Sequence, residues 1–342
     1  MVSRSVANLM TSLLLGTAMI SIGVNSLSTS SRSAPLGQRE TASRSLDHNE
    51  NNRRRFLEYG GVAMATMGLP VAVAWSAAPK DAMASDASSS AGKIASRLEK
   101  DILNLPAPSY ASEFNGIDNT YFPSFLQGEW EVTQTLVDTS TPLGLKFVGG
   151  PNGSISIAEK TMDQAKSKLN QPVNLKLRYL PTKWGVAEDR LFNNEQRLNA
   201  FAEKKVVASV NYADVGGSNR GSVLALGGTD QDPLQTTIVY FKGPAAQKSF
   251  VVSHGGESLG EDSWAGYELQ RSIFALTNQN TAPPITTDTE YIWKFEKLDS
   301  DHVQGKLRIA GYLNAQGDTL YFDARNRAVS LQDYTLDYRR SK

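Results

Sequence analysis

The residues best suited to chemistry stand close together at Glu188, Asp189 and Arg190, shortly after Lys183 and Trp184. Two carboxylates can do acid and base work when their surroundings push their pKa values apart. Adjacent acids at the start of a stretch with helical spacing more often cap the helix and interact with its dipole. We therefore predict no catalytic residue here, and treat these five residues as candidates for contact with a partner.

Two loops rich in glycine or aspartate have ordinary explanations. Gly149, Gly150 and Gly153 could form a nest of backbone amides before a helix, but no Lys-Ser/Thr follows as a phosphate-binding loop requires. A tight turn accounts for these glycines. Asp230 and Asp232 have a spacing that could hold a cation, although a hairpin turn is the commoner use of such a sequence. We predict neither a nucleotide site nor a metal site.

His254 is the other residue with catalytic chemistry, because Ser253 and Glu257 stand near it. The chain has no Gly-x-Ser-x-Gly elbow, and neighbours along a strand point to opposite faces, so we expect no catalytic triad. An unperturbed imidazole titrates at about pH 6.5. Two interpretations of His254 therefore stay open: a solvent-facing residue at a strand end, or a group that responds to an acidifying compartment.

Composition excludes several classes of protein. The 342 residues include no cysteine and three histidines, which excludes disulfide frameworks, thiolate nucleophiles and cysteine-ligated metal sites. The 35 basic and 35 acidic residues balance, unlike those of a strongly basic nucleic-acid-binding protein. Hydrophobic residues make up 40% of the chain, enough for a packed core. We expect a binding protein rather than an enzyme, without a nucleic-acid partner.

The N-terminal region has the pattern of targeting signals. Residues 1–28 have the apolar run of a secretory signal peptide, and residues 29–52 have the Ser- and Arg-rich composition of a transit peptide. Residues 53–84 begin with three arginines and Phe-Leu and end with Ala-Met-Ala, typical of a twin-arginine signal. A membrane anchor over Gly60–Ala78 is the alternative. Three signals in series resemble the import route into a complex plastid, and predict a location in the chloroplast thylakoid lumen.

After an N-terminal arm at 85–120, residues 121–342 are predicted to form one antiparallel β domain. Period-two alternation and turn residues place strands at 129–136, 173–179, 205–212, 220–226, 234–242, 247–253, 265–276, 290–296, 303–309, 318–323 and 327–339. Residues 157–169 and 187–201 have helical spacing. Strands this numerous close into a barrel or stack as a sandwich. We predict an all-β fold with minor helices, an up-and-down β-barrel of about ten strands with two short helical insertions.

A Gly-x-Trp motif, Gly128-Glu129-Trp130, stands at the start of the first of these strands. In lipocalin-like (calycin) barrels such a motif closes the barrel floor, with the tryptophan beneath a cation from the final strand. The cations available near the C-terminus are Arg325, Arg327, Arg339 and Arg340. A guanidinium over an indole contributes roughly 0.5 to 2 kcal/mol. The motif therefore resembles the lipocalin-like floor, and a tryptophan buried in any β core is the alternative.

Four longer motifs carry a second resemblance. They are Thr141–Gly153, Pro181–Arg190, Val215–Arg220 and Ala225–Pro233. These stretches look like a family of cyanobacterial, plant and algal plastid proteins that share a domain of unknown function, over about residues 121–340. The resemblance implies a photosynthetic location and brings no activity with it.

The favoured function is binding of an apolar ligand inside the barrel, for which we expect a carotenoid, a chlorophyll-type pigment or a lipid. The alternation assigns nine lining residues: Trp130, Leu175, Leu177, Tyr179, Tyr291, Trp293, Phe295, Leu307 and Ile309. In a small barrel the same side chains can simply form the core.

Two other functions stay open. A non-enzymatic auxiliary or assembly factor would dock through its surface on a photosystem or another thylakoid membrane complex. An enzyme acting on xanthophylls has a lumenal precedent in the lipocalin-like de-epoxidase, but that enzyme relies on a cysteine-rich domain, and this chain has no cysteine. Residues 85–342 contain no stretch apolar enough to span a membrane, so any association with thylakoids would be peripheral.

Overall fold

The computed structural model describes residues 92–99, 102–108, 119–150, 153–212, 236–278, 284–315 and 317–341. Several sequence predictions lie outside these stretches: the targeting signals at 1–84, the strand at 220–226, the motifs at 215–220 and 225–233, Asp230, Asp232, and residues 151–152 of the glycine-rich loop.

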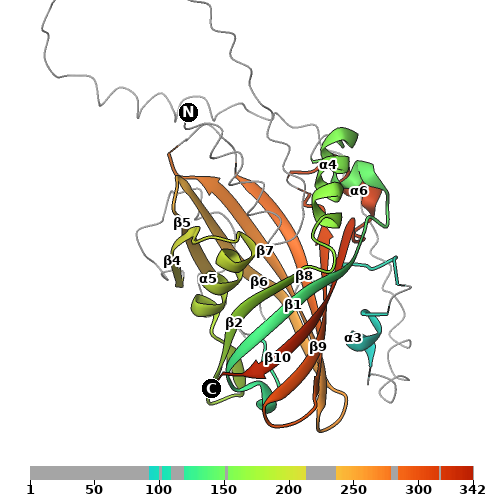
Figure 1. Cartoon of the computed structure of the whole chain (residues 1–342). Helices are drawn as coiled ribbons and strands as arrows, with labels where there is room; N and C mark the ends of the chain where they lie inside the picture. The colour runs from blue at the N-terminus through green and yellow to red at the C-terminus, as the bar shows by residue number, and fades with distance from the viewer. Residues whose placement is uncertain are drawn as a thin grey trace, which may run out of the picture. The chain divides into compact units, whose positions relative to one another are not determined.

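In the described residues, ten strands form one curled antiparallel sheet (Figure 1). They are β1 (Gly128–Ser140), β2 (Pro172–Pro181), β3 (Val186–Glu188), β4 (Val207–Tyr212), β5 (Thr236–Phe241), β6 (Ala245–Ser258), β7 (Ser263–Leu276), β8 (Ile285–Lys297), β9 (His302–Tyr312) and β10 (Ser330–Arg340). Each strand pairs with its neighbours in sequence, except that β3 and β4 form the two edges, and β1 pairs with β10. Among the strands that the structure describes, β3 and β4 do not pair with each other, so the curled sheet is open along one seam. The predicted antiparallel, up-and-down arrangement of about ten strands is confirmed.

Short helices occupy the connections. They are α3 (Lys93–Ser96), α4 (Ile155–Lys166), α5 (Arg190–Phe201) and α6 (Tyr321–Ala324), with 3-10 helices at Ser124–Leu126 and Leu145–Val148. The two predicted helical insertions correspond to α4 and α5. The second begins later than predicted because Val186–Glu188 pairs with β2 as strand β3. Helix α5 contacts β2 on one side and β4 on the other, so it lies along the open seam (Figure 1).

The strand predicted at 318–323 is wrong. The amides of Gly317 and Asp318 donate to the carbonyl of Asn314, and the Asp318 carboxylate accepts from the Asn314 amide at 2.7 Å. A short polar side chain that bonds to nearby backbone competes with strand ladders. The turn therefore leads directly into α6, although Leu320, Tyr321 and Phe322 are residues that also occur often in strands or cores.

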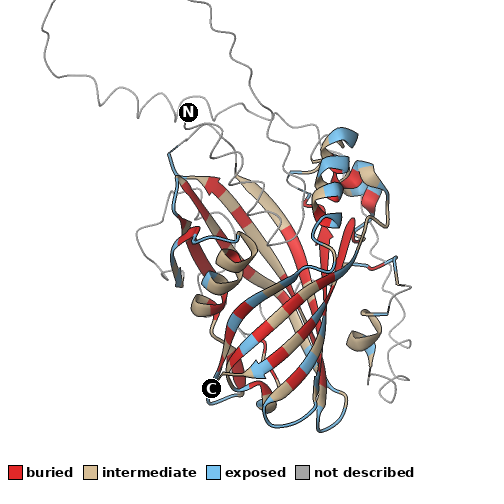
Figure 2. Ribbon diagram, in the orientation of Figure 1, coloured by how far each residue is buried: buried red, intermediate tan, exposed pale blue. Residues whose placement is uncertain are grey.

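The main hydrophobic core lies on the inner face of β1, β2, β8, β9 and β10. On β1, Trp130, Val132 and Leu136 are buried, whereas the intervening Glu131 is exposed. Figure 2 shows the same alternation as buried and exposed bands along these strands. Because successive side chains of a strand point to opposite faces, the pairing register of a strand determines which of its side chains point inward.

The Gly-x-Trp motif closes one end of the curled sheet. The Arg340 guanidinium lies 4.3 Å from the centre of the Trp130 ring, and Arg340 Nη1 donates to the Gln127 carbonyl at 3.0 Å. The indole Nε1 of Trp130 donates to the Leu126 carbonyl at 2.7 Å. A Cβ at Gly128, where φ is +120°, would lie 2.7 Å from Arg340 Nη1, so this position needs glycine. Of the four candidate arginines, Arg340 makes the predicted contact.

The N-terminal segments 92–99 and 102–108 lie against the outer face of the sheet. Leu105 is buried in a cluster with Leu269 of β7, Ile292 of β8 and Ala310 of β9. These outward-facing positions are apolar because the arm covers them. The sheet is therefore covered on both faces in this region.

Buried ion pairs accompany this contact. Arg97 donates to both carboxylate oxygens of Glu290, at 2.8 and 2.7 Å, and the Tyr312 hydroxyl donates to the same carboxylate at 2.7 Å. Burial raises the pKa of Glu290 despite the opposing effect of Arg97. Arg308 pairs with Asp333 at 2.7 Å and donates to the carbonyl of Arg97 at 2.9 Å. These bonds fix the arm to β8, β9 and β10.

Replacing Arg340 by alanine is expected to destabilise the fold. The Arg340→Ala variant loses the contact with the Trp130 ring and the hydrogen bond to Gln127, together about 1 to 2 kcal/mol of unfolding free energy. Urea unfolding followed by tryptophan fluorescence measures the change. The control is Arg339→Ala, since the Arg339 side chain is 59% exposed and pairs only with Asp337 among the described ion pairs. Equal midpoints for the two variants would contradict the floor interpretation.

Candidate functional site

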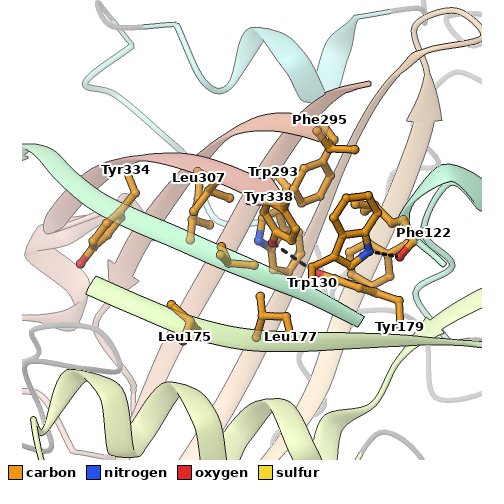
Figure 3. Close-up of a cluster of buried hydrophobic side chains, with 14 of the residues drawn as sticks. Phe122, Trp130, Leu175, Leu177, Tyr179, Trp293, Phe295, Leu307, Tyr334 and Tyr338 are labelled. Carbon is orange, nitrogen blue, oxygen red and sulfur yellow. Dashed lines mark hydrogen bonds between the residues drawn. The ribbon is translucent and has the colours of Figure 1, made fainter. Parts of the chain in front are cut away.

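The nine residues predicted to line the interior belong to one cluster on the inner face. Eight are buried, and Tyr291 is partly buried. Figure 3 labels seven of the nine, Trp130, Leu175, Leu177, Tyr179, Trp293, Phe295 and Leu307, together with Phe122, Tyr334 and Tyr338 of the same cluster. The rings of Tyr291 and Trp293 stack at 5.9 Å with an interplanar angle of 11°. Five of the nine form the apolar wall of the cavity described below: Leu177, Tyr291, Trp293, Leu307 and Ile309. The other four pack in the core.

The opposite wall, on β5, β6 and β7, is polar, and the sequence analysis missed it. The Ser249 and Ser272 hydroxyls lie 2.7 Å apart, and Gln247 Nε2 donates to Ser249 Oγ at 3.1 Å. On α5, Asn194 Nδ2 donates to the Thr237 hydroxyl at 3.2 Å. The alternation of Gln247 and Ser249 was a usable signal, but alternation does not say which face is inside. The two walls face each other across the interior.

Two arginine–glutamate pairs connect α5 with β3 and β7. Arg190 donates to Glu268 of β7 through both terminal nitrogens, at 3.1 and 2.6 Å. Arg197 donates to Glu188 of β3, and Arg190 Nη1 lies 3.7 Å from the same carboxylate. The side chains of Arg190, Glu188 and Glu268 are at most 5% exposed. The two arginines and the two glutamates together carry no net charge.

The carboxylate of Glu268 keeps its charge in this buried position. Burial acts to raise its pKa, but the Arg190 guanidinium and the hydrogen bonds to the carboxylate outweigh burial and hold the pKa at about 2. Gln270 Nε2 contributes one of these bonds, at 2.8 Å. Glu268 is therefore an acceptor for Arg190 at any moderate pH, and is unsuited to act as a general acid there.

A cavity of about 70 Å³ lies between α5 and the two walls. Its lining includes Leu177, Trp293 and Leu307 on the apolar side and Gln247 and Ser272 on the polar side. A groove of about 360 Å³ adjoins it, between the end of α4, the end of α5 and the strands β1, β2 and β10. Because Gln134 and Phe201 line both spaces, they stand at the junction.

Gln134 is the one polar residue among the buried inward positions of β1. It is 5% exposed and lies between the buried Val132 and Leu136 along that face. Within the part of the chain that the structure describes, its side-chain amide forms no hydrogen bond. The amide atoms are not fully enclosed, because Gln134 borders both the cavity and the groove. This residue is therefore a second functional candidate that the sequence analysis missed.

The five residues predicted as partner contacts are divided by the fold. Glu188 and Arg190 point into the interior, where a macromolecular partner does not reach. Asp189 caps α5, since its carboxylate accepts from the Phe192 amide at 3.2 Å, as expected for an acid at a helix start. Lys183 and Trp184 lie in the β2–β3 turn, with Lys183 Nζ 3.9 Å from the centre of the Trp184 ring and Trp184 65% exposed.

Ser253, His254 and Glu257 do not meet. The Ser253 hydroxyl lies 3.2 Å from that of Tyr267, and the Glu257 carboxylate accepts from amides of α3. His254 pairs in register with Glu268 and is partly exposed, so it lies within β6 and not at a strand end. In the described ranges, no three His, Asp or Glu side chains are arranged to hold a metal ion. No described helix has both the length and the apolar character needed to cross a membrane.

Removing the Glu268 charge is expected to destabilise the protein in a pH-dependent way. Glu268→Gln leaves Arg190 buried without its carboxylate, which costs about 3 to 5 kcal/mol of unfolding free energy at pH 7. The carboxyl pKa is lowered in the folded state, so the stabilisation is fully present above the unfolded pKa of about 4.3 and decreases as pH falls toward 2. Urea midpoints at pH 7, 5 and 3 should show a constant, then narrowing, difference from the parent chain.

The matched control for this measurement is Glu159→Gln, at an exposed position of α4. Its midpoint should follow that of the parent chain at all three pH values. A Glu268→Gln variant that behaves like this control would show that the buried pair contributes nothing to the fold.

Comparison with curated proteins and with solved structures found no significant match. The model of one family, described as a domain of unknown function (DUF6816), matches residues 115–342. This span contains the whole curled sheet, the two walls and both spaces between them. The match confirms the resemblance to a family of unknown function that the sequence motifs carried. The chain belongs to the DUF6816 family of proteins with a domain of unknown function.

Proposed function

We propose that this protein binds an amphipathic small molecule inside its curled sheet. The observation that supports this most directly is the pair of unlike walls around one internal space: Leu177, Trp293 and Leu307 on one side, Gln247 and Ser272 on the other. A core built only for stability is cheaper to fill with apolar side chains, since each buried polar group must find hydrogen bonds. The sequence predicts an apolar ligand, and the polar wall favours one that also has a polar part.

Among the three ligands expected, a lipid suits the space best. The inner cavity of about 70 Å³ is small beside the roughly 300 to 1,000 Å³ of typical ligand pockets. A rigid tetrapyrrole or a full-length carotenoid would require α5 to move away from the seam. A flexible acyl chain can instead occupy the adjoining groove of about 360 Å³, where Leu136, Val173 and Phe201 supply apolar surface.

We also propose a location in the cell and a second candidate function. A chloroplast thylakoid lumen location is supported by the three targeting patterns in residues 1–84, and a lipid would be at hand at the membrane surface there. The second candidate function, docking on a thylakoid complex, is favoured by the exposed Trp184 with Lys183 beside its ring. Tryptophan is enriched at the centres of protein interfaces.

Filling the cavity is expected to abolish binding. In Ser249→Phe, a phenyl ring projects from the polar wall into a space of about 70 Å³. N-phenyl-1-naphthylamine, an uncharged fluorophore that brightens in apolar surroundings, serves as the probe. We expect saturable binding of one probe molecule per parent chain and an affinity at least tenfold lower for Ser249→Phe.

The control is Ser209→Phe, which adds the same ring at an exposed position of β4. It should bind the probe like the parent chain, and unfolding midpoints should establish that both variants fold. Unchanged affinity in a folded Ser249→Phe variant would refute binding in the interior.

A further inference from the structure

We infer that the ligand carries a small, uncharged hydrogen-bonding head, and that the amide of Gln134 binds this head at the junction of cavity and groove. The inference rests on the proposed function and specifies the chemical class of its ligand: a neutral amphiphile, such as a monoacylglycerol, rather than a fatty acid or a phospholipid.

The charges around the cavity disfavour a charged head group. The charged side chains that line the inner cavity are Glu188, Arg190 and Arg197 among the described residues, and Arg190 is held by Glu268 through two hydrogen bonds. Both guanidinium groups have carboxylate partners, although Arg190 Nε itself makes no hydrogen bond. An anionic head would add a negative charge to a buried set of two arginines and two glutamates whose net charge is already zero. A neutral head avoids that added charge.

Gln134 has hydrogen-bonding capacity that no described residue uses. Its amide offers two donors and an acceptor oxygen, and none of them has a partner among the described residues. The side chain is 5% exposed and lines both the cavity and the groove. A hydroxyl or carbonyl placed at the junction would satisfy this amide.

The cavity and the groove differ in size, which assigns the head and the chain of the ligand to different spaces. The cavity of about 70 Å³ holds a head of a few atoms, whose hydroxyls face Gln247 and Ser272 and whose C–H groups face Trp293. The larger groove holds the chain, which passes Phe201 at the junction. The ion pair of Lys168 with Glu203, 2.6 Å long, lies at the outer border of the groove. The head is thus expected in the cavity and the chain toward the surface.

The test measures displacement of N-phenyl-1-naphthylamine from the full chain at pH 7.5 by two competitors with the same chain length, 1-lauroylglycerol and laurate. We expect 1-lauroylglycerol to bind at least tenfold more tightly than laurate. In Gln134→Leu, the affinity for 1-lauroylglycerol should fall about tenfold, which corresponds to the loss of one hydrogen bond. The affinity for the fluorophore should change less than twofold.

Two further variants keep the test decisive. Gln304→Leu makes the same change at an exposed position of β9 and should leave all affinities unchanged. Gln134→Met, with an unbranched side chain of similar length, replaces Gln134→Leu if the latter unfolds. An equal affinity for laurate and 1-lauroylglycerol would overturn the inference. So would a Gln134→Leu variant that still prefers 1-lauroylglycerol to laurate as strongly as the parent chain does. In both cases, binding of the fluorophore would still support the proposed function. No binding of any of the three compounds would overturn both.

Discussion

One buried ion pair, between Arg190 on α5 and Glu268 on β7, connects the helix at the open seam to the opposite wall of the sheet. Such a pair adds little stability compared with apolar residues of similar volume, but removing one member leaves an unpaired charge in a dry interior. The pair therefore acts mainly as a positional constraint. It fixes where α5 lies over the inner face, and so it determines the size of the inner cavity and which side chains border it.

In one region of the sheet, the outer face is covered by other parts of the chain as well as the inner face. The arm at 92–99 and 102–108 covers the outer face of β7, β8 and β9 with Leu105. Charged groups such as Glu290 and Arg308 are consequently buried outside the barrel, and each is matched by a specific partner. Apolar residues on the outer face and polar residues on the inner face therefore occur in the same part of the sheet.

Much of the fold could be predicted from the sequence because its signals are local. Alternation along β1, β2, β8, β9 and β10 gave the strands, and Gly128 with Trp130 gave the floor, including the arginine from the last strand. The polar wall could not be predicted in this way, because the alternation that places Gln247 and Ser249 on one face of β6 does not show whether that face points inward or outward. Which side faces inward depends on contacts distant in sequence: the arm from residue 92 onward and the pair of Arg190 with Glu268, 78 positions apart.

The ladder between β1 and β10 sets a limit on when this molecule can take its final form during synthesis. Trp130 stands opposite Arg340 in that ladder, and the Arg340 side chain bonds to a carbonyl 213 positions earlier. A ribosome releases β1 long before it has made its partner, so the first strand has one edge unpaired until residues 330–340 have been made. Contacts so far apart in sequence also slow the folding step itself. A chaperone that covers the free edge of β1 during this interval would protect the chain from pairing with others like it.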